Sequence, residues 1–176
     1  LSVHLIIAFI IISLIMWNYL KLKLNNYSDE RLKFGLPLIF LSLIYLQIVI
    51  GAFVSGMDAG QIYNSWPLMG SNYFPDDNDH LNLFKLSAFS DPSLVQFMHR
   101  NLAYLILFFY FFLKIKIYLN KLNNLYFAIN LLGLFLLIQI VLGIFTLLYG
   151  AQIVLASMHQ ISSIFLVSSS IYFLYL

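Results

Sequence analysis

Five stretches of about 20 apolar residues dominate this chain and restrict the folds open to it. They cover residues 1–20, 36–56, 94–113, 126–148 and 152–176. A helix of about 20 apolar residues is long enough to cross the hydrocarbon core of a bilayer. The composition, 62% hydrophobic and only 9% charged, agrees with repeated membrane crossing. We therefore expect an all-α integral membrane protein with five transmembrane helices.

The charges between these stretches change sign from one connection to the next. The first connection carries Lys21, Lys23, Arg31 and Lys33, and the third carries Lys114, Lys116 and Lys121. The second, residues 57–91, holds five aspartates and one lysine. Because lysine and arginine stay on the cytoplasmic or matrix side, we expect the first and third connections inside. The acidic connection and the tight turn at residues 149–151 then lie outside.

A short motif occurs twice. Gln47-Ile-Val-Ile-Gly51-Ala-Phe53 matches Gln139-Ile-Val-Leu-Gly143-Ile-Phe145 at five of seven positions. Chance similarity within apolar sequence is the alternative, but a glutamine four residues before a glycine is unusual inside a span. We favour an internal repeat, a common way of building membrane proteins.

Two histidines, His99 and His159, lie at matching depths within two of the spans. Asp91-Pro92 is a good helix start, because aspartate caps free N–H groups and proline fits the first helical position. His99 follows eight residues after Asp91, about 12 Å along a helix, and His159 lies eight or nine residues beyond Gly150-Ala151. Both helices run from outside to inside. We therefore expect the two histidines to be level and to face each other diagonally across an up-down four-helix bundle.

This pair suits the two axial positions of a haem iron. Ionisable residues within a span are costly and usually functional, and facing helices of a bundle commonly supply both ligands. Small residues nearby, including Ser162 and Ser163, leave room for a flat macrocycle, although ordinary helix packing also uses them. The alternative for each histidine is a neutral polar residue hydrogen-bonded inside the bundle. We favour axial ligation by His99 and His159.

Three further residues, Arg100, His4 and His80, are candidates for parts of a site. Arg100 could pair with a haem propionate or extend to the outer interface, and we favour the propionate. His4 lies near the outer end of the first span without a partner histidine in this chain. His80, in the acidic connection, is interpreted as a solvated loop residue. The absence of cysteine excludes disulfides and thiolate metal sites.

The motifs together resemble the haem A synthase family. The resemblance rests on residues 47–60, 63–69 and 96–100, on the second Gln-Ile-Val-Leu-Gly and on Met158-His159-Gln160. It covers nearly the whole chain in order. It corresponds to the carboxy-terminal half of that family plus the last helix of the amino-terminal half, so we expect a fragment of a longer protein.

The resemblance implies a domain division. Residues 1–20 would be the last helix of the amino-terminal half, residues 21–35 a cytoplasmic basic loop, and residues 36–176 a four-helix haem-binding bundle with an extracytoplasmic loop at 57–91. His99 and His159 match the ligands of a haem b cofactor. His4 matches one histidine of the half that holds the substrate haem. No catalytic residue of the family is assigned within this chain.

The activity implied is oxidation of the C8 methyl of haem O to the formyl of haem A, for cytochrome oxidase assembly. The chain alone is then expected to be inactive. Implied partners are haem O, membrane lipid, the amino-terminal half, haem O synthase, an electron donor and oxidase assembly factors. The location implied is a bacterial plasma membrane or the mitochondrial inner membrane. Nothing indicates nucleic-acid binding.

Two other functions compete with this one. A membrane b-type cytochrome that only relays electrons would also need the level histidines. A transporter or scaffold would use the histidines to relay protons or to pack. The repeated glutamine motif and the Trp66-Pro67 segment favour the haem-modifying oxidoreductase.

Overall fold

The structure, a computed structural model, describes residues 2–24, 32 and 35–176. Five long helices account for most of them: α1 (Ser2–Lys23), α2 (Gly35–Gly56), α3 (Pro92–Leu119), α4 (Tyr126–Leu148) and α5 (Ile153–Tyr175). All five are long and apolar enough to cross a membrane. No strand occurs among the described residues. The predicted all-α membrane fold is confirmed, whereas Arg31 and Lys33 of the basic connection lie outside the described residues.

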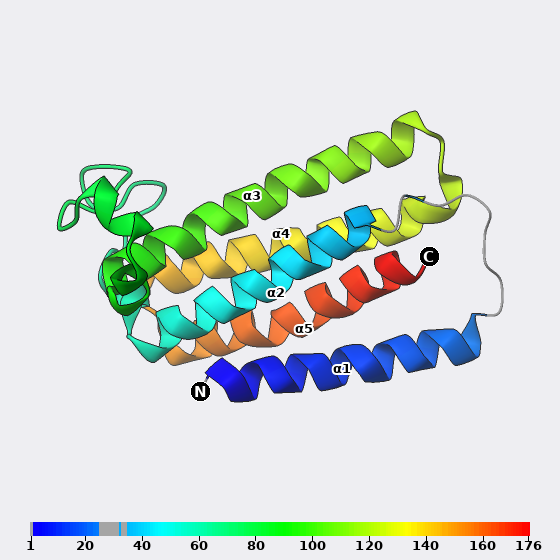
Figure 1. Cartoon of the computed structure of the whole chain (residues 1–176), viewed down its shortest axis with the longest axis horizontal. Helices are drawn as coiled ribbons and strands as arrows, with labels where there is room; N and C mark the ends of the chain where they lie inside the picture. The colour runs from blue at the N-terminus through cyan, green and yellow to red at the C-terminus, as the bar shows by residue number, and fades with distance from the viewer. Residues whose placement is uncertain (1, 25–31, 33–34) are drawn as a thin grey trace.

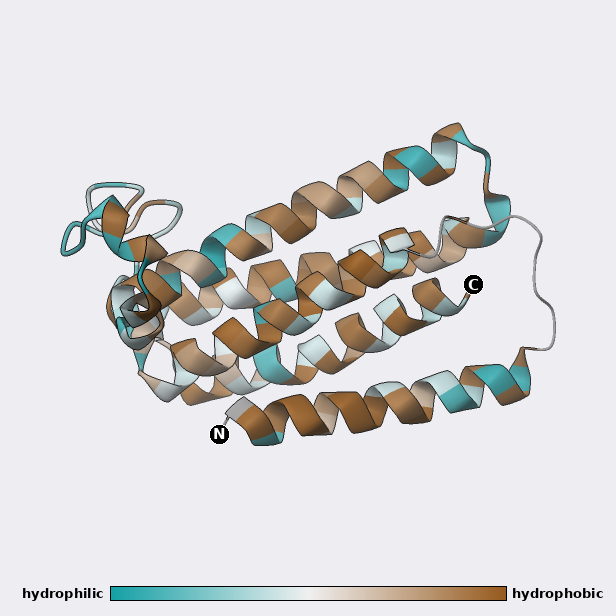
Figure 2. Ribbon diagram, viewed as in Figure 1, coloured by the Kyte–Doolittle hydropathy of each residue, from teal (hydrophilic) through white to brown (hydrophobic). Residues whose placement is uncertain are grey.

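The helices lie side by side along the length of the molecule (Figure 1). Helices α1, α3 and α5 run in one direction, and α2 and α4 run in the other. Helix α2 packs against α3, and α4 packs against α5, while α2 also contacts α5. Helix α1 joins this four-helix bundle from outside, against α5 and α2. Figure 2 shows apolar residues along the helices and hydrophilic residues mainly at their ends and in the loop.

Helix α3 begins as the sequence indicates and ends later. The Asp91 side chain accepts a hydrogen bond from the Leu94 N–H at 3.1 Å, with Pro92 in the first turn. The expected span stops at residue 113, but the helix continues to Leu119. Lys114 Nζ lies 5.9 Å from the Tyr110 ring centroid, over the ring face. A lysine can therefore stay in the helix, since its long side chain lies along apolar surface.

The connection between α2 and α3 is folded rather than extended. It contains three short 3-10 helices, η1 (Ala59–Gln61), η2 (His80–Phe84) and η3 (Leu86–Ser90), and a cis bond between Trp66 and Pro67. The connection between α4 and α5 is a tight turn in which Gly150 and Ala151 have φ angles of 65° and 55°. Both connections lie at the same end of the bundle (Figure 1).

The larger group of fully buried side chains lies toward the opposite end and includes Phe40, Ile44, Leu113, Ile117, Ile129, Leu132, Ile171 and Phe173. At the loop-bearing end, Met69, Leu94 and Val95 are also fully buried. By contrast, none of the described residues 137–148 of α4 and 153–161 of α5 is buried. The protein's own side chains therefore leave the two helices accessible on the loop-bearing side, where His159 lies.

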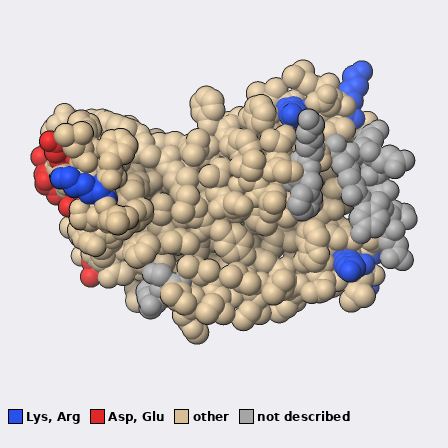
Figure 3. Space-filling view, viewed as in Figure 1, with Lys and Arg blue, Asp and Glu red and all other residues tan. Residues whose placement is uncertain are grey.

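Charge is segregated along the same axis. In Figure 3 the visible acidic side chains gather at the loop-bearing end, and most visible lysine and arginine side chains lie at the other end. This separation matches the sign change seen between the connections.

Candidate functional site

The first repeat motif forms a cradle around His99. Gln47 Nε2 lies 3.2 Å from His99 Nε2 and donates to the His99 carbonyl oxygen at 3.0 Å. One turn further along α2, Gly51 faces the same imidazole, and a Cβ at Gly51 would stand 3.0 Å from His99 Cε1. Glutamine and glycine four residues apart share one face of a helix. The motif therefore contacts one histidine of the next helix in two ways. The Gln47 amide bonds to His99, and the absence of a side chain at Gly51 leaves space for the His99 ring.

The second motif repeats this geometry around His159. Gln139 Nε2 lies 3.3 Å from His159 Nε2 and donates to the His159 carbonyl oxygen at 3.0 Å. A Cβ at Gly143 would stand 3.0 Å from His159 Cε1. The agreement extends to the distances, so the duplicated sequence corresponds to a duplicated structure. The predicted internal repeat is thereby given a physical role.

The hydrogen bonds define the protonation of both rings. An amide nitrogen only donates, so each histidine Nε2 must accept and the proton of a neutral ring must lie on Nδ1. Both Nδ1 atoms are buried without a partner. An unprotonated ring nitrogen is the atom through which histidine ligates a metal. Each Nε2 has a single lone pair, and in this structure the glutamine amide occupies it, so ligation through Nε2 requires the glutamine to release that bond.

This ligand set fits a cofactor better than a free ion. No group of three or more histidine, cysteine, aspartate or glutamate side chains within the described ranges could hold a metal ion. A haem iron needs only two axial ligands from the protein, because the macrocycle supplies the rest. Gly51 and Gly143 each face a histidine ring, and the loop-side halves of α4 and α5 stay accessible beside His159.

Arg100 binds the long loop, a role that sequence reasoning missed. Its Nη1 donates to the carbonyl oxygens of Ser65 at 2.9 Å and Leu68 at 3.2 Å, and its Nη2 donates to that of Tyr63 at 2.9 Å. Its Nε is buried without a partner. If Arg100 pairs with a haem propionate as predicted, its guanidinium has to do so while it also makes these three hydrogen bonds to the loop.

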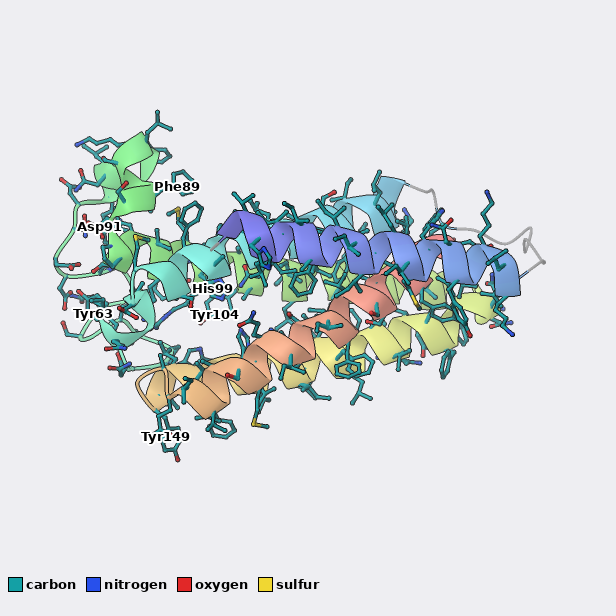
Figure 4. All side chains as sticks on the ribbon, turned by 90° about the horizontal axis from the view of Figure 1, so that it is seen from below. Tyr63, Phe89, Asp91, His99, Tyr104 and Tyr149 are labelled. Atoms are coloured by element: carbon teal, nitrogen blue, oxygen red, sulfur yellow. The ribbon has the colours of Figure 1, made fainter. Side chains whose placement is uncertain are left out.

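Neighbours of Arg100 on α3 hold the same loop. Gln96 Nε2 donates to the Tyr63 carbonyl at 3.1 Å, and Trp66 Nε1 donates to the Tyr104 hydroxyl at 3.0 Å. Figure 4 labels Tyr63 of the loop and Tyr104 of α3. Gln96, Arg100 and Tyr104 are spaced by four, so they form one stripe along α3. That spacing was visible in the sequence and could have indicated a polar face that binds the loop.

The other two histidines are separate from these cradles. His4 is exposed near the start of α1. His80 is exposed in the loop, where its ring centroid lies 4.0 Å from that of Phe74. The structure therefore places His99 and His159 in matching cradles, His4 on the peripheral helix, and His80 where the sequence indicates.

The loop also ties a carboxylate to the start of α3. Partial burial by itself raises the pKa of Asp77, but hydrogen bonds from Ser93 Oγ at 2.6 Å and the Tyr63 hydroxyl at 3.1 Å outweigh it and hold that pKa below its usual value. Burial first, and then the bond to Asp77, raise the pKa of Tyr63. An ionised Asp77 thus stabilises the loop against the bundle.

Comparison with known proteins gives the same family throughout. Residues 1–171 match the family described as COX15-CtaA, cytochrome oxidase assembly protein. The chain is 42% identical over 175 residues to the haem A synthase of Pelagibacter ubique, covering 99% of this chain and 52% of that protein. The haem A synthases of Rickettsia bellii strain OSU 85-389 and Rickettsia prowazekii are 41% and 38% identical, over 96% and 99% of this chain and 51% and 53% of theirs.

The chain thus spans about half the length of the curated relatives it matches. No solved structure matches. On the strength of the match over residues 1–171, the chain belongs to the COX15-CtaA family of cytochrome oxidase assembly proteins.

Proposed function

We propose that this chain is the haem b-binding part of a haem A synthase, with His99 and His159 as the two axial ligands. The observation that carries the proposal is the pair of matching cradles. Each presents a neutral imidazole to the bundle with its Nε2 free of a proton. Relatives named haem A synthase, at about 40% identity over nearly the whole chain, support the haem A synthase part of this proposal.

Each part of the cradle has a task in this proposal. Gln47 and Gln139 keep the proton of each neutral ring on Nδ1 and occupy its Nε2 lone pair, which they would release to the haem iron. Gly51 and Gly143 leave room for the imidazoles. Arg100, whose Nε is buried and unpaired, offers a charged donor to a propionate. A haem held by two imidazoles supplies one-electron oxidation and reduction.

The substrate and the partners are part of the proposal. The reaction would convert the C8 methyl of haem O to the formyl of haem A. His4 would ligate the substrate haem together with residues of the amino-terminal half, and we assign no catalytic residue within this chain. Haem O synthase, an electron donor and oxidase assembly factors are the proposed protein partners. Because the chain spans about half of its relatives, we expect it to be inactive by itself.

The proposed arrangement in the membrane follows the charges. Residues 36–176 form the haem-binding bundle, residues 1–20 belong to the amino-terminal half, and residues 21–35 form the cytoplasmic loop between them. The acidic loop 57–91 lies on the outer face of a bacterial plasma membrane or mitochondrial inner membrane.

Haem titration of the purified chain tests the ligand assignment. The wild-type chain should give the optical spectrum of a low-spin haem, and His99→Ala and His159→Ala should each lose it. His80→Ala is the matched control, because His80 is an exposed loop histidine. A low-spin spectrum that persists in either cradle variant would refute the assignment.

Pigment analysis separates the proposed enzyme from an electron carrier. The full-length protein should be expressed in cells that make haem O, and the haems extracted. Accumulation of haem A supports the proposed reaction. A full-length protein that binds haem but produces no haem A is instead a b-type cytochrome.

A further inference from the structure

Large apolar side chains are exposed in one segment of the long loop, residues 80–90, which contains η2 and η3. Phe84 is 88% exposed and Leu86 is 90% exposed, and Leu81 is exposed as well. The two short helices contact each other, so these side chains belong to one folded unit. Apolar side chains gathered on a protein surface usually mark an interaction site. The segment is therefore suited to an apolar partner rather than to water alone.

The charges of the loop are arranged around this segment. All five aspartates of the loop lie outside residues 80–90, which carry Lys85 and no acidic residue. The flanking Asp79 and Asp91 side chains cap η2 and α3. The Lys85 ammonium donates to Asn82 Oδ1 at 2.9 Å, and a lysine ammonium has two further donors for another acceptor. An apolar surface with an exposed cation is complementary to a phospholipid, which has acyl chains beneath an anionic phosphate.

The position of the segment favours the bilayer as this partner. The ring centroid of Phe89 in η3 lies 6.4 Å from that of Phe53 on α2. Phe53 precedes the end of α2 by three residues, about 4.5 Å along the axis, so η3 is level with the end of a transmembrane helix. Figure 4 shows the segment, in green, to one side of the helix bundle. A segment placed beside the end of a span lies over the surrounding membrane surface.

We propose that residues 80–90 are an interfacial anchor, in which Leu81, Phe84 and Leu86 insert into the bilayer surface and Lys85 binds lipid phosphate. Interfacial segments bind through their buried apolar area and through attraction between basic residues and anionic lipid. The long lysine side chain can reach the phosphates from apolar surroundings. The anchor goes beyond the proposed haem function and is independent of it, because none of its residues belongs to a cradle.

Spin labels on single cysteines measure the surroundings of this segment directly. This chain has no cysteine, so Phe84→Cys and Leu86→Cys each give one labelling position after any cysteine outside this chain is replaced. The full-length protein is placed in phospholipid nanodiscs, so that the amino-terminal half is present. Electron paramagnetic resonance then compares collisions of the label with oxygen, which concentrates in the bilayer, and with a water-soluble nickel chelate.

The ratio of oxygen to nickel collisions decides between lipid, water and protein as the partner. We expect it to be several-fold higher at residues 84 and 86 than at Ser71→Cys, an exposed position in the same loop. Phe108→Cys, exposed in the middle of α3, is the reference for a side chain in lipid. Ready collision with nickel would place the segment in water and overturn the proposal. Few collisions with either reagent would overturn it too, because protein would then cover these residues.

Substitutions near a label at Ser87→Cys separate the apolar and charged contributions. Phe84→Ser combined with Leu86→Ser should lower the ratio at residue 87 to near the Ser71 value. Lys85→Glu should lower it less, because phosphate repels a carboxylate, and Lys85→Arg should preserve it. Thermal unfolding in detergent should be unchanged by these exposed substitutions. A ratio at residue 87 that the double variant leaves unchanged would contradict the anchor, whatever haem titration shows.

Discussion

The helix pairs α2–α3 and α4–α5 carry the same cradle on very different connections. One pair is joined by the folded loop of residues 57–91, the other by a turn of four residues, 149–152. The glutamine-to-carbonyl distance is nevertheless 3.0 Å in both. The register of each pair is therefore set by the glutamine, the glycine and the histidine rather than by the connection. The long loop is therefore not needed to set this register. It is bound to the bundle by Arg100.

The largest effect is expected where the two pairs meet. A Cβ at Gly133 of α4 would lie 2.0 Å from the Tyr110 hydroxyl oxygen and 2.6 Å from Tyr110 Cζ on α3. Gly133→Ala should lower the free energy of unfolding by about 3 kcal/mol, because a close-packed interior resists an added group. Thermal unfolding in detergent measures it. Combining it with Tyr110→Leu should restore part of the loss, and a fully stable Gly133→Ala chain would show that the pairs do not pack as described.

A second test compares the residues that directly follow the two histidines, Arg100 on α3 and Gln160 on α5. Arg100→Ala removes three hydrogen bonds to the loop, and bonds from a charged donor are worth about 1.5–3 kcal/mol each. Proteolysis within residues 57–91 should become at least about tenfold faster. Gln160 follows His159 and is exposed, so Gln160→Ala is the matched control and should leave cleavage unchanged. Equal cleavage rates in Arg100→Ala and Gln160→Ala would show that Arg100 does not hold the loop.

A third test asks whether the cradles are equivalent. Gly51→Ala and Gly143→Ala each place a Cβ 3.0 Å from a histidine Cε1, closer than ordinary contact. Each should displace its imidazole and lower haem affinity about tenfold, consistent with an overpacking cost of about 1–3 kcal/mol. Haem titration compares the two variants directly. A loss confined to one of them would show that the repeat is not functionally symmetric.

The smallest effect concerns pH and should be limited to the loop of the first pair. The pKa of Asp77 is held below its ordinary value, so its stabilisation is complete above that value and is lost as the pH falls toward the folded-state pKa. Pepsin cleavage of the loop should therefore rise as the pH drops below about 4, beyond the enzyme's own pH dependence.

The Asp77→Asn variant is the control for this pH effect. It should show increased cleavage already above pH 4 and a flatter profile below it. The turn at residues 149–152 has no carboxylate and should not respond. If cleavage of the wild type and of Asp77→Asn depended on pH identically, the Asp77 carboxylate would not be the cause of the effect.

Much of the fold could be predicted from the sequence because it depends on local patterns. The apolar runs gave five spans, the Asp91-Pro92 start is confirmed, and the repeat identified Gln47 and Gln139 as matching residues. The end of α3 was missed, since hydropathy falls at Lys114 while the helix continues. The division into domains at residues 20 and 35 stays a prediction.

The candidate site was predicted less completely. The structure gives His99 and His159 the same glutamine contacts, and their role as ligands stays a proposal. The loop contacts of Arg100 were not predicted, because they go to backbone carbonyls that carry no sequence signature. The hydrogen bond from Ser162 Oγ on α5 to Gln139 Oε1 on α4 was also not predicted, because a serine in a span usually bonds to its own helix.

The sequence by itself determined the number of spans, their alternating direction and the helix face that carries each motif. These properties follow from hydropathy and from the helical period, which act within one segment. Only the tertiary structure decided that each glutamine holds the histidine of the very next helix, that Arg100 binds the loop, and that Ser162 bonds to Gln139. Those contacts depend on how separate segments approach one another, because a helical pattern specifies a face but not the side chain that will meet it.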